Sequence, residues 1–191
     1  MNNRVLGGLV AATALVAGLA GCSGPGIPAA APPASTAGAV ADGSHNAADV
    51  AFVQGMIPHH QQAIMMSDLV ATRSASPEIT QLAASISGAQ GPEIEQMTRM
   101  LSTWGVAPGG SMSGMSGMMG PQQMQQLQTL AGPAFDRAWL GMMIEHHTGA
   151  VEMSRVELAQ GQDSGARALA TDIVTSQQAE IGQMQTLLGQ G

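Results

Sequence analysis

The sequence predicts an all-α protein, a four-helix bundle built from two tandem helical hairpins. The chain contains an internal duplication, and each copy holds two long apolar-striped segments separated by a turn. The apolar volume comes from Leu, Ile, Val, Ala and 15 Met, with two Trp, two Phe and no Tyr, which favours helices over strands. Because a single hairpin cannot bury its own apolar stripes, the two copies should pair into one bundle.

The duplication aligns two segments without a gap. Asp49–Ser67 reads DVAFVQGMIPHHQQAIMMS and Asp136–Ser154 reads DRAWLGMMIEHHTGAVEMS, an offset of 87 residues (136 − 49). The same offset continues beyond these segments and pairs Leu82 with Leu169. Self-similarity over this length is the sequence signature of a repeated structural unit.

The first 45 residues are expected to lie outside the bundle. Residues 1–21 place one Arg before a short apolar run, as in a signal peptide, and Leu19–Cys22 looks like the bacterial lipobox, in which the cysteine is acylated. Cys22 is the only cysteine and so has no disulfide partner within the chain. Residues 22–45, rich in Pro, Ala, Gly and Ser, read as a flexible tether. We expect an exported lipoprotein, anchored to the outer face of the cytoplasmic membrane or held in the periplasm or outer membrane.

Residues 46–191 form the predicted duplicated domain. Its first helix should run from about Asn46, a good N-cap, to Thr72, with a kink or local opening at Pro58. The segment Ser76–Glu78 offers a cap, an N1 proline and a first-turn acid, so a second helix should start there. Gly105 should end that helix just after Trp104.

The second copy should repeat this hairpin. A helix is expected to start at Gly132-Pro133, a turn to fall at Gly161–Gly165, and the last helix to reach about Leu188. Between the copies, residues 105–120 form a Gly-, Ser- and Met-rich linker that we expect to be mobile without metal. Pro121–Ala131 is expected to add a short peripheral helix.

The charge pattern argues against nucleic acid as a partner. The chain has six Arg, no Lys and a formal net charge of −7, and its cations are scattered rather than clustered. The sequence indicates no organic cofactor and no particular protein partner.

Two matching sets of possible metal ligands fall on the predicted inner faces. In each copy, a Met lies three and four residues before a His-His pair on the first helix, and a Glu lies within the apolar stripe of the second. Counting residues from each turn puts the histidines level with the Glu to within about one helical turn. The sets are Met56, His59, His60, Glu93 and Met97 in the first copy, and Met143, His146, His147, Glu180 and Met184 in the second.

The donor types favour copper. Carboxylate di-iron bundles carry a Glu-x-x-His motif, whereas this chain has Met56 and Met143 in place of that Glu. Imidazole together with thioether suits a soft ion, above all Cu(I). The linker methionines could form an accessory site for Cu(I) or Ag(I), or could be adaptable apolar contacts. They are Met112, Met115, Met118 and Met119.

Two alternatives to a copper-binding protein stay open. The His and Glu side chains could form a structural hydrogen-bond network in a metal-free envelope or interaction protein. Adjacent helical residues point about 100° apart, so only one His of each pair can face fully inward. The chain could also be a metal-dependent oxidoreductase that uses Glu93, Glu180 and the histidines. The lack of Glu-x-x-His and of Tyr disfavours this enzyme.

The pattern D-x-x-F/W-x-x-x-M-x-x-H-H-x-x-A-x-x-M, present as Asp49–Met66 and Asp136–Met153, resembles the bacterial family called domain of unknown function 305. The resemblance covers about residues 46–189. It implies a ferritin-like four-helix fold, usually exported, and, from a similar periplasmic copper-binding protein, copper binding through Met and His. Carried onto this chain, it implies ligands at Met56, His59, His60, Met66, Met143, His146, His147 and Met153. Sequence and resemblance together predict a lipoprotein that sequesters or buffers copper outside the cytoplasmic membrane.

Overall fold

The computed structural model describes residues 45–109 and 115–189, which belong to one compact unit. The predicted signal peptide, nearly all of the tether, Cys22 and Met112 lie outside these residues. The described residues form five helices and no strand. The helices are α1 (Ala47–Arg73), α2 (Pro77–Trp104), α3 (Pro121–Thr129), α4 (Gly132–Gln160) and α5 (Ser164–Gly189). The predicted all-α fold is therefore confirmed.

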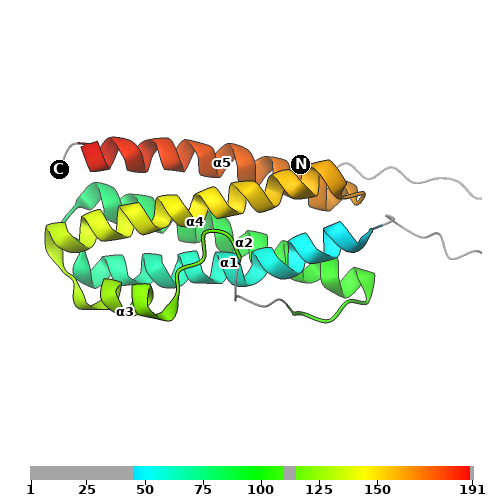
Figure 1. The fold of residues 1–191 in the computed structure, drawn as a ribbon, viewed down its shortest axis with the longest axis horizontal. Helices are drawn as coiled ribbons and strands as arrows, with labels where there is room; N and C mark the ends of the chain where they lie inside the picture. Colours follow the sequence, from blue (N-terminus) through cyan, green and yellow to red (C-terminus); the bar gives the residue numbers. More distant parts are fainter. Residues whose placement is uncertain (1–44, 110–114, 190–191) are drawn as a thin grey trace, which may run out of the picture. The chain divides into compact units, whose positions relative to one another are not determined.

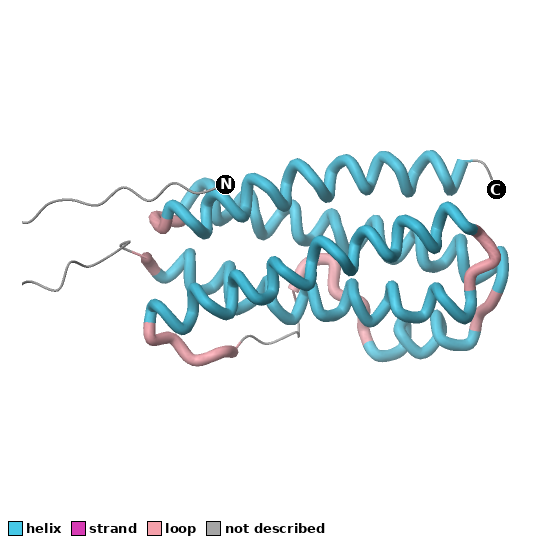
Figure 2. Tube along the Cα trace, turned by 180° about the vertical axis from the view of Figure 1, so that it is seen from behind, coloured by secondary structure: helices cyan, strands magenta, loops and turns pink. Residues whose placement is uncertain are grey.

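The four long helices form the two expected hairpins. Helix α1 packs along α2, α4 packs along α5, and the contact between α1 and α4 joins the hairpins. Both views show the four helices running side by side, with the short α3 beside the bundle (Figures 1 and 2). None of the helices in the described ranges is both long and apolar enough to cross a membrane.

Helix boundaries follow the capping signals in the sequence. The Asn46 side chain accepts hydrogen bonds from the backbone N–H groups of Ala48 and Asp49, and Ser76 caps α2 through the N–H of Ile79. Gly105 ends α2 with a φ of 67°, a conformation that glycine adopts without strain. Helix α1 is continuous at Pro58, so the expected opening of the backbone at this proline is not seen.

Two apolar clusters fill the bundle, and the duplication relates one to the other. One cluster contains Phe52, Met56, Met97 and Ile173. The other contains their equivalents 87 positions away, Trp139, Met143, Met184 and Ile86. Each cluster takes side chains from both hairpins, so neither hairpin buries its apolar face without the other.

Residues 115–120, which we call the strap, pack against the bundle, and they form the last part of the linker 105–120 that the sequence predicts to be mobile without metal. The strap packs on α1, because the Gln62 side chain donates to the Met119 carbonyl at 2.9 Å and accepts from the Met119 N–H at 2.7 Å. It also packs on α4, where a Cβ added to Gly149 would lie 2.1 Å from the Ser116 carbonyl oxygen. Gly117 (φ 77°) completes this close approach. The anchors of the strap lie in the helices, which is why its own composition gave no signal of order.

Candidate metal centre

Four fully buried histidines lie where the two hairpins meet. His59 of α1 and His146 of α4 face each other, with ring centroids 3.8 Å apart and ring planes inclined by 41°. The adjacent His60 and His147 are also completely buried, and the His146 and His147 ring centroids are 6.2 Å apart. The duplication thus brings both His-His pairs into one region of the interior, as the sequence predicted.

His60 and His147, which we call the outer histidines, each pair with the glutamate of their own hairpin. His60 Nε2 lies 2.7 Å from Glu93 Oε2, and His147 Nε2 lies 2.8 Å from Glu180 Oε2. A carboxylate can only accept, so these Nε2 atoms donate, and in the neutral form of each ring the Nδ1 atom carries the lone pair. Residue counting from the turn places both histidines level with Glu93 to within one helical turn and leaves open which of them faces it. Neighbouring helical side chains diverge by about 100°, so His59 faces α4 while His60 faces α2.

The strap hydrogen-bonds only one of the two facing histidines, His59 and His146, which we call the inner histidines. His59 Nε2 donates to the Ser116 carbonyl of the strap at 3.2 Å, whereas neither ring nitrogen of His146 makes a hydrogen bond of ordinary geometry. Within the described residues, the ring nitrogens left without a partner are His59 Nδ1, His60 Nδ1, both nitrogens of His146, and His147 Nδ1. The centre therefore presents several lone pairs that no protein donor satisfies.

Burial keeps the inner pair neutral at physiological pH. Loss of solvation, with a smaller contribution from His60, lowers the pKa of His59 to about 4. Loss of solvation is also the main cause that lowers the pKa of His146, and charge repulsion from His59 and then His147 lowers it further. The His59 backbone raises this pKa only weakly. A neutral imidazole is the form that binds a metal ion.

Two further equivalent pairs of buried polar side chains were not predicted as part of the site. Gln90 and Gln177 are each 2 % exposed, and Ser67 and Ser154 are also buried. Both Gln90 side-chain polar atoms, the Gln177 carbonyl oxygen and both Ser hydroxyls lack a hydrogen-bond partner in the described structure. The sequence signal for them was present, since each pair is identical at the offset of 87 residues.

The predicted methionine ligands are divided between the two apolar clusters. Met56 and Met97 belong to one, and Met66, Met143 and Met184 to the other. Met153 is partly buried against the first of these clusters. In the described part of the chain, no three His, Cys, Asp or Glu side chains converge on a point where they could hold a metal. A complete coordination shell around the histidines would therefore need thioether, amide or hydroxyl donors.

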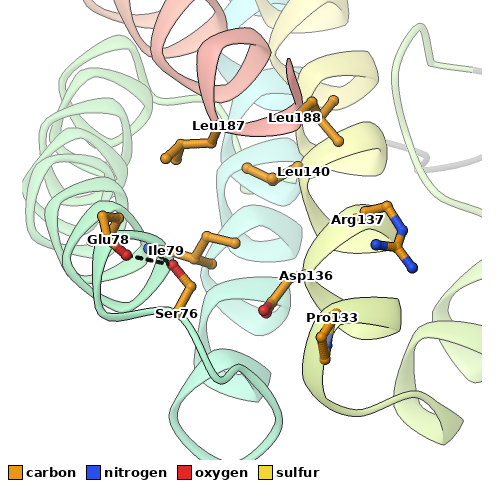
Figure 3. A pocket seen from close by; sticks show the side chains of 9 residues that line it. All are labelled: Ser76, Glu78, Ile79, Pro133, Asp136, Arg137, Leu140, Leu187 and Leu188. Carbon is orange, nitrogen blue, oxygen red and sulfur yellow. Dashed lines mark hydrogen bonds between the residues drawn. The ribbon is translucent and has the colours of Figure 1, made fainter. Parts of the chain in front are cut away.

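The pocket in Figure 3 is separate from the histidines. It lies between the start of α2, the first part of α4 and the end of α5, and none of the predicted ligands lines it. Its lining consists of Ser76, Glu78, Ile79, Pro133, Asp136, Arg137, Leu140, Leu187 and Leu188. We therefore do not place the metal centre there.

A buried carboxyl pair that was not predicted lies where α1 begins and α4 ends. Asp49 accepts from the N–H groups of Gln162 and Asp163, both at 3.0 Å. Burial alone would raise the pKa of Asp49, but the bond from the Asn46 N–H, then the Glu157 side chain and then these two bonds lower it. Burial and then the neighbouring Asp49 raise the pKa of Glu157 to about 8. The equivalent of Glu157 in the first copy is Val70, so the duplication gave no hint of this pair.

Comparison with known proteins gives one family match. Residues 49–188 match the family described as Domain of unknown function (DUF305). A DUF305 fragment from Deinococcus radiodurans is 34% identical, with a TM-score of 0.72 over 77% of this chain and 99% of that one. A DUF305 protein of Streptomyces coelicolor, described as secreted, is 33% identical, with a TM-score of 0.71 over 75% of this chain and 93% of that one.

A metal-binding protein has a similar fold. CopM in its Cu(I)-bound form is 32% identical, with a TM-score of 0.66 over 74% of this chain and 96% of that one. CopM has also been solved in Ag-bound and Cu(II)-bound forms. Uncharacterized protein L153 of Acanthamoeba polyphaga mimivirus is 43% identical over 53 residues, 28% of this chain, and the match spans 35% of that protein.

Proposed function

This chain belongs to the DUF305 family, and from that membership and the buried histidines we propose that it binds and sequesters copper outside the cytoplasmic membrane. Copper is here the cargo of the protein. The similarity to CopM, which binds Cu(I), Cu(II) and Ag, supports a soft or borderline metal ion as the ligand.

The observation that carries the proposal is the set of ring nitrogens without partners. A buried polar group that lacks a hydrogen bond costs about 1 to 3 kcal/mol, so a fold does not retain several of them for stability alone. His146 is fully buried with neither ring nitrogen hydrogen-bonded, and it faces His59. Both rings are neutral at physiological pH, as ligation requires.

The Glu–His bonds support distinct roles for the two residue types. His60 and His147 would each offer Nδ1 to a metal, while Glu93 and Glu180 hold the far side of each ring, an arrangement common behind metal-binding histidines. Because no three of these side chains converge in the described structure, one metal ion would take at most two of the four histidines. Glu93 and Glu180, predicted from the sequence as direct ligands, would thus orient ligands instead. Imidazole together with thioether donors suits Cu(I) better than a hard ion.

The hydrogen bonds between the outer histidines and the glutamates also favour an alternative, in which the side chains form a structural network. In that case His60–Glu93 and His147–Glu180 would stiffen each hairpin, and the bundle would need no metal. This alternative explains the outer histidines but leaves His59 and His146 with unpaired buried nitrogens.

The decisive experiment removes the inner pair. The variant His59→Gln/His146→Gln is expected to weaken Cu(I) binding by about 100-fold or more while helicity is retained, because neither side chain pairs with a carboxylate. Competition with a Cu(I) chelator measures the affinity, and circular dichroism measures helicity. His45→Gln is the matched control, since His45 stacks on Trp104 away from this centre. Equal affinity in parent and double variant would refute the proposal.

A second arm of the same titration tests the orienting role. Glu180→Gln keeps the shape of the side chain but weakens its hold on His147, and we expect a loss of Cu(I) affinity of about 10- to 100-fold. A structural network predicts instead that stability falls in metal-free buffer and that the affinity of the folded protein does not change.

Export and lipid anchoring are a further part of the proposal, supported by the Leu19–Cys22 segment and the secreted relative. We expect Cys22→Ser to move the protein from the membrane fraction to the soluble fraction, or to leave the precursor uncleaved, because the acylated side chain is lost. Fractionation and mass measurement of the mature N-terminus decide this. A variant that stays membrane-bound and is processed like the parent would disprove anchoring at Cys22.

A further inference from the structure

The pocket in Figure 3 contains a buried carboxylate oxygen that has no hydrogen-bond partner. Asp136 Oδ1 is shielded from solvent, and no donor among the described residues reaches it. Figure 3 shows the Asp136 carboxyl pointing from α4 toward α2, beside the apolar side chains of Ile79 and Leu140. A buried acceptor without a donor is costly, so this oxygen marks a place that a donor from outside the chain could fill.

The equivalent residue of the first copy, Asp49, shows what a carboxylate at this position requires. It accepts from three backbone N–H groups, those of Asn46, Gln162 and Asp163. The first lies where α1 begins, and the other two lie in the turn between α4 and α5. Because the offset of 87 residues relates the two copies, Asp136 would be expected to meet the three corresponding donors.

Each of these three donors is missing at Asp136. The equivalents of the three donor residues are, in the same order, Pro133, Ala75 and Ser76. Pro133 has no backbone N–H. The Ser76 N–H donates instead to the Ser74 hydroxyl at 3.0 Å, and the Ala75 N–H does not reach Asp136 Oδ1. One copy thus saturates its carboxylate with backbone groups, and the other copy leaves it open.

The other polar groups of the pocket do not supply a donor either. The Ser76 hydroxyl is already engaged, since it donates to Glu78 Oε2 at 2.9 Å and accepts from the N–H of Ile79. The positive end of α2, which would attract an anion, is therefore capped by Ser76 and faced by Glu78. In Figure 3 the Arg137 side chain extends from the side of α4 opposite to the Asp136 carboxyl. The pocket therefore presents carboxylate acceptors beside apolar side chains.

We propose that this pocket binds a primary ammonium group carried on a short apolar chain. An ammonium group offers three N–H donors, the number that Asp49 receives from the backbone. Its apolar chain lies on the lining formed by Ile79, Leu140, Leu187 and Leu188. The cavity has a volume of about 290 Å³, at the small end of ligand sites, so the ligand is a small molecule. The proposal is independent of the copper centre, because none of the predicted metal ligands lines this pocket.

The test is a titration of the full chain with n-hexylamine, which is protonated at pH 7 as a Lys side chain is. Calorimetry gives the affinity, and backbone amide NMR shifts locate the site. We expect saturable binding with the largest shifts around Ile79, Leu140 and Leu188. Hexanol and hexanoate carry the same chain without the ammonium group, and we expect each to bind about 10-fold more weakly or less, since neither offers a charged donor to Asp136.

Two variants of equal charge keep the result specific. Asp136→Asn removes the charge but keeps the shape, and is expected to weaken hexylamine binding by about 10-fold or more. Asp172→Asn removes an exposed carboxylate from α5 and should bind like the parent, which controls for general attraction to an acidic protein. Thermal denaturation checks the fold. Asp136→Asn should melt no lower than the parent, whereas Asp49→Asn, which disturbs three backbone bonds, should melt lower.

Two outcomes would overturn the proposal. One is equal affinity for hexylamine in the parent and in Asp136→Asn. The other is hexanoate binding as tightly as hexylamine, because Arg137 rather than Asp136 would then select the ligand. Either outcome leaves the copper centre untouched, since His59→Gln/His146→Gln tests that centre in a different part of the bundle.

Discussion

Gly149→Ala is expected to destabilise the protein by about 2 to 3 kcal/mol, although the same change inside a helix usually stabilises by about 0.5 to 1 kcal/mol. The new Cβ would lie 2.1 Å from the Ser116 carbonyl oxygen and 2.8 Å from the Gly117 Cα, and both atoms belong to backbone that cannot rotate away. The strap would have to move. Its movement would break the bonds from His59 to Ser116 and between Gln62 and Met119.

The matched control is Gly141→Ala in the same helix. A Cβ at Gly141 meets nothing within 4 Å, so this variant should be as stable as the parent or slightly more stable. Chemical denaturation gives the free energy of unfolding, and limited proteolysis reports whether residues 105–120 become cleavable. If both variants have the same stability and the same cleavage pattern, the strap does not contribute to the fold as described.

The stability of the parent is expected to fall as pH rises, and Glu157→Gln is expected to abolish this fall. The pKa of Glu157 is raised to about 8, above its ordinary 4.5, so between these values the folded state holds a proton that the unfolded state has released. Stability must then fall with rising pH in this window, by about 1.4 kcal/mol per pH unit, and level off above pH 8. Between pH 6.5 and 8 we expect a loss of about 2 kcal/mol.

The charges that face Glu157 support this direction. Asp49 of α1 and Asp163 of the α4–α5 turn repel an ionised Glu157, and Arg167 of α5 offsets this only in part. Denaturation at pH 6.5, 7.25 and 8 measures the slope, which should nearly vanish in Glu157→Gln. Glu145→Gln removes an exposed carboxylate from the same helix and should retain the slope of the parent. A parent whose stability does not change across this window would show that Glu157 is ionised throughout.

The fold could be predicted because its signals are local or repeated. Asn46, Ser76 and Gly105 each act within one helical turn, so their capping roles follow from the sequence alone. The offset of 87 residues identified the hairpins and brought the two His-His pairs together. Which histidine would face Glu93 could not be predicted, because a rotation of α1 by one residue exchanges His59 and His60.

The strap could not be predicted because it depends on contacts distant in the chain. Its order comes from Gln62 and Gly149, which look unremarkable by themselves, and not from the residues of the linker. The sequence does mark these two residues in one way. Gln62 and Gly149 occupy equivalent positions of the two similar copies, yet one has a long amide side chain and the other has none. Gly55 and Met142 mismatch in the same way beside Met115. Differences between the copies thus mark the surface on which the strap lies.

This asymmetry bears on how such a bundle can arise. A single hairpin carries only half of the His59–His146 pair, so an ancestral hairpin would have completed its interior as a symmetric homodimer, with position 62 identical in both subunits. Two copies of Gln62 or two of Gly149 could not hold one strap on both sides. Within one duplicated chain each copy can mutate separately, and the two can divide these tasks. Duplication within one chain therefore permits one histidine of a facing pair to donate to the strap while the other makes no hydrogen bond.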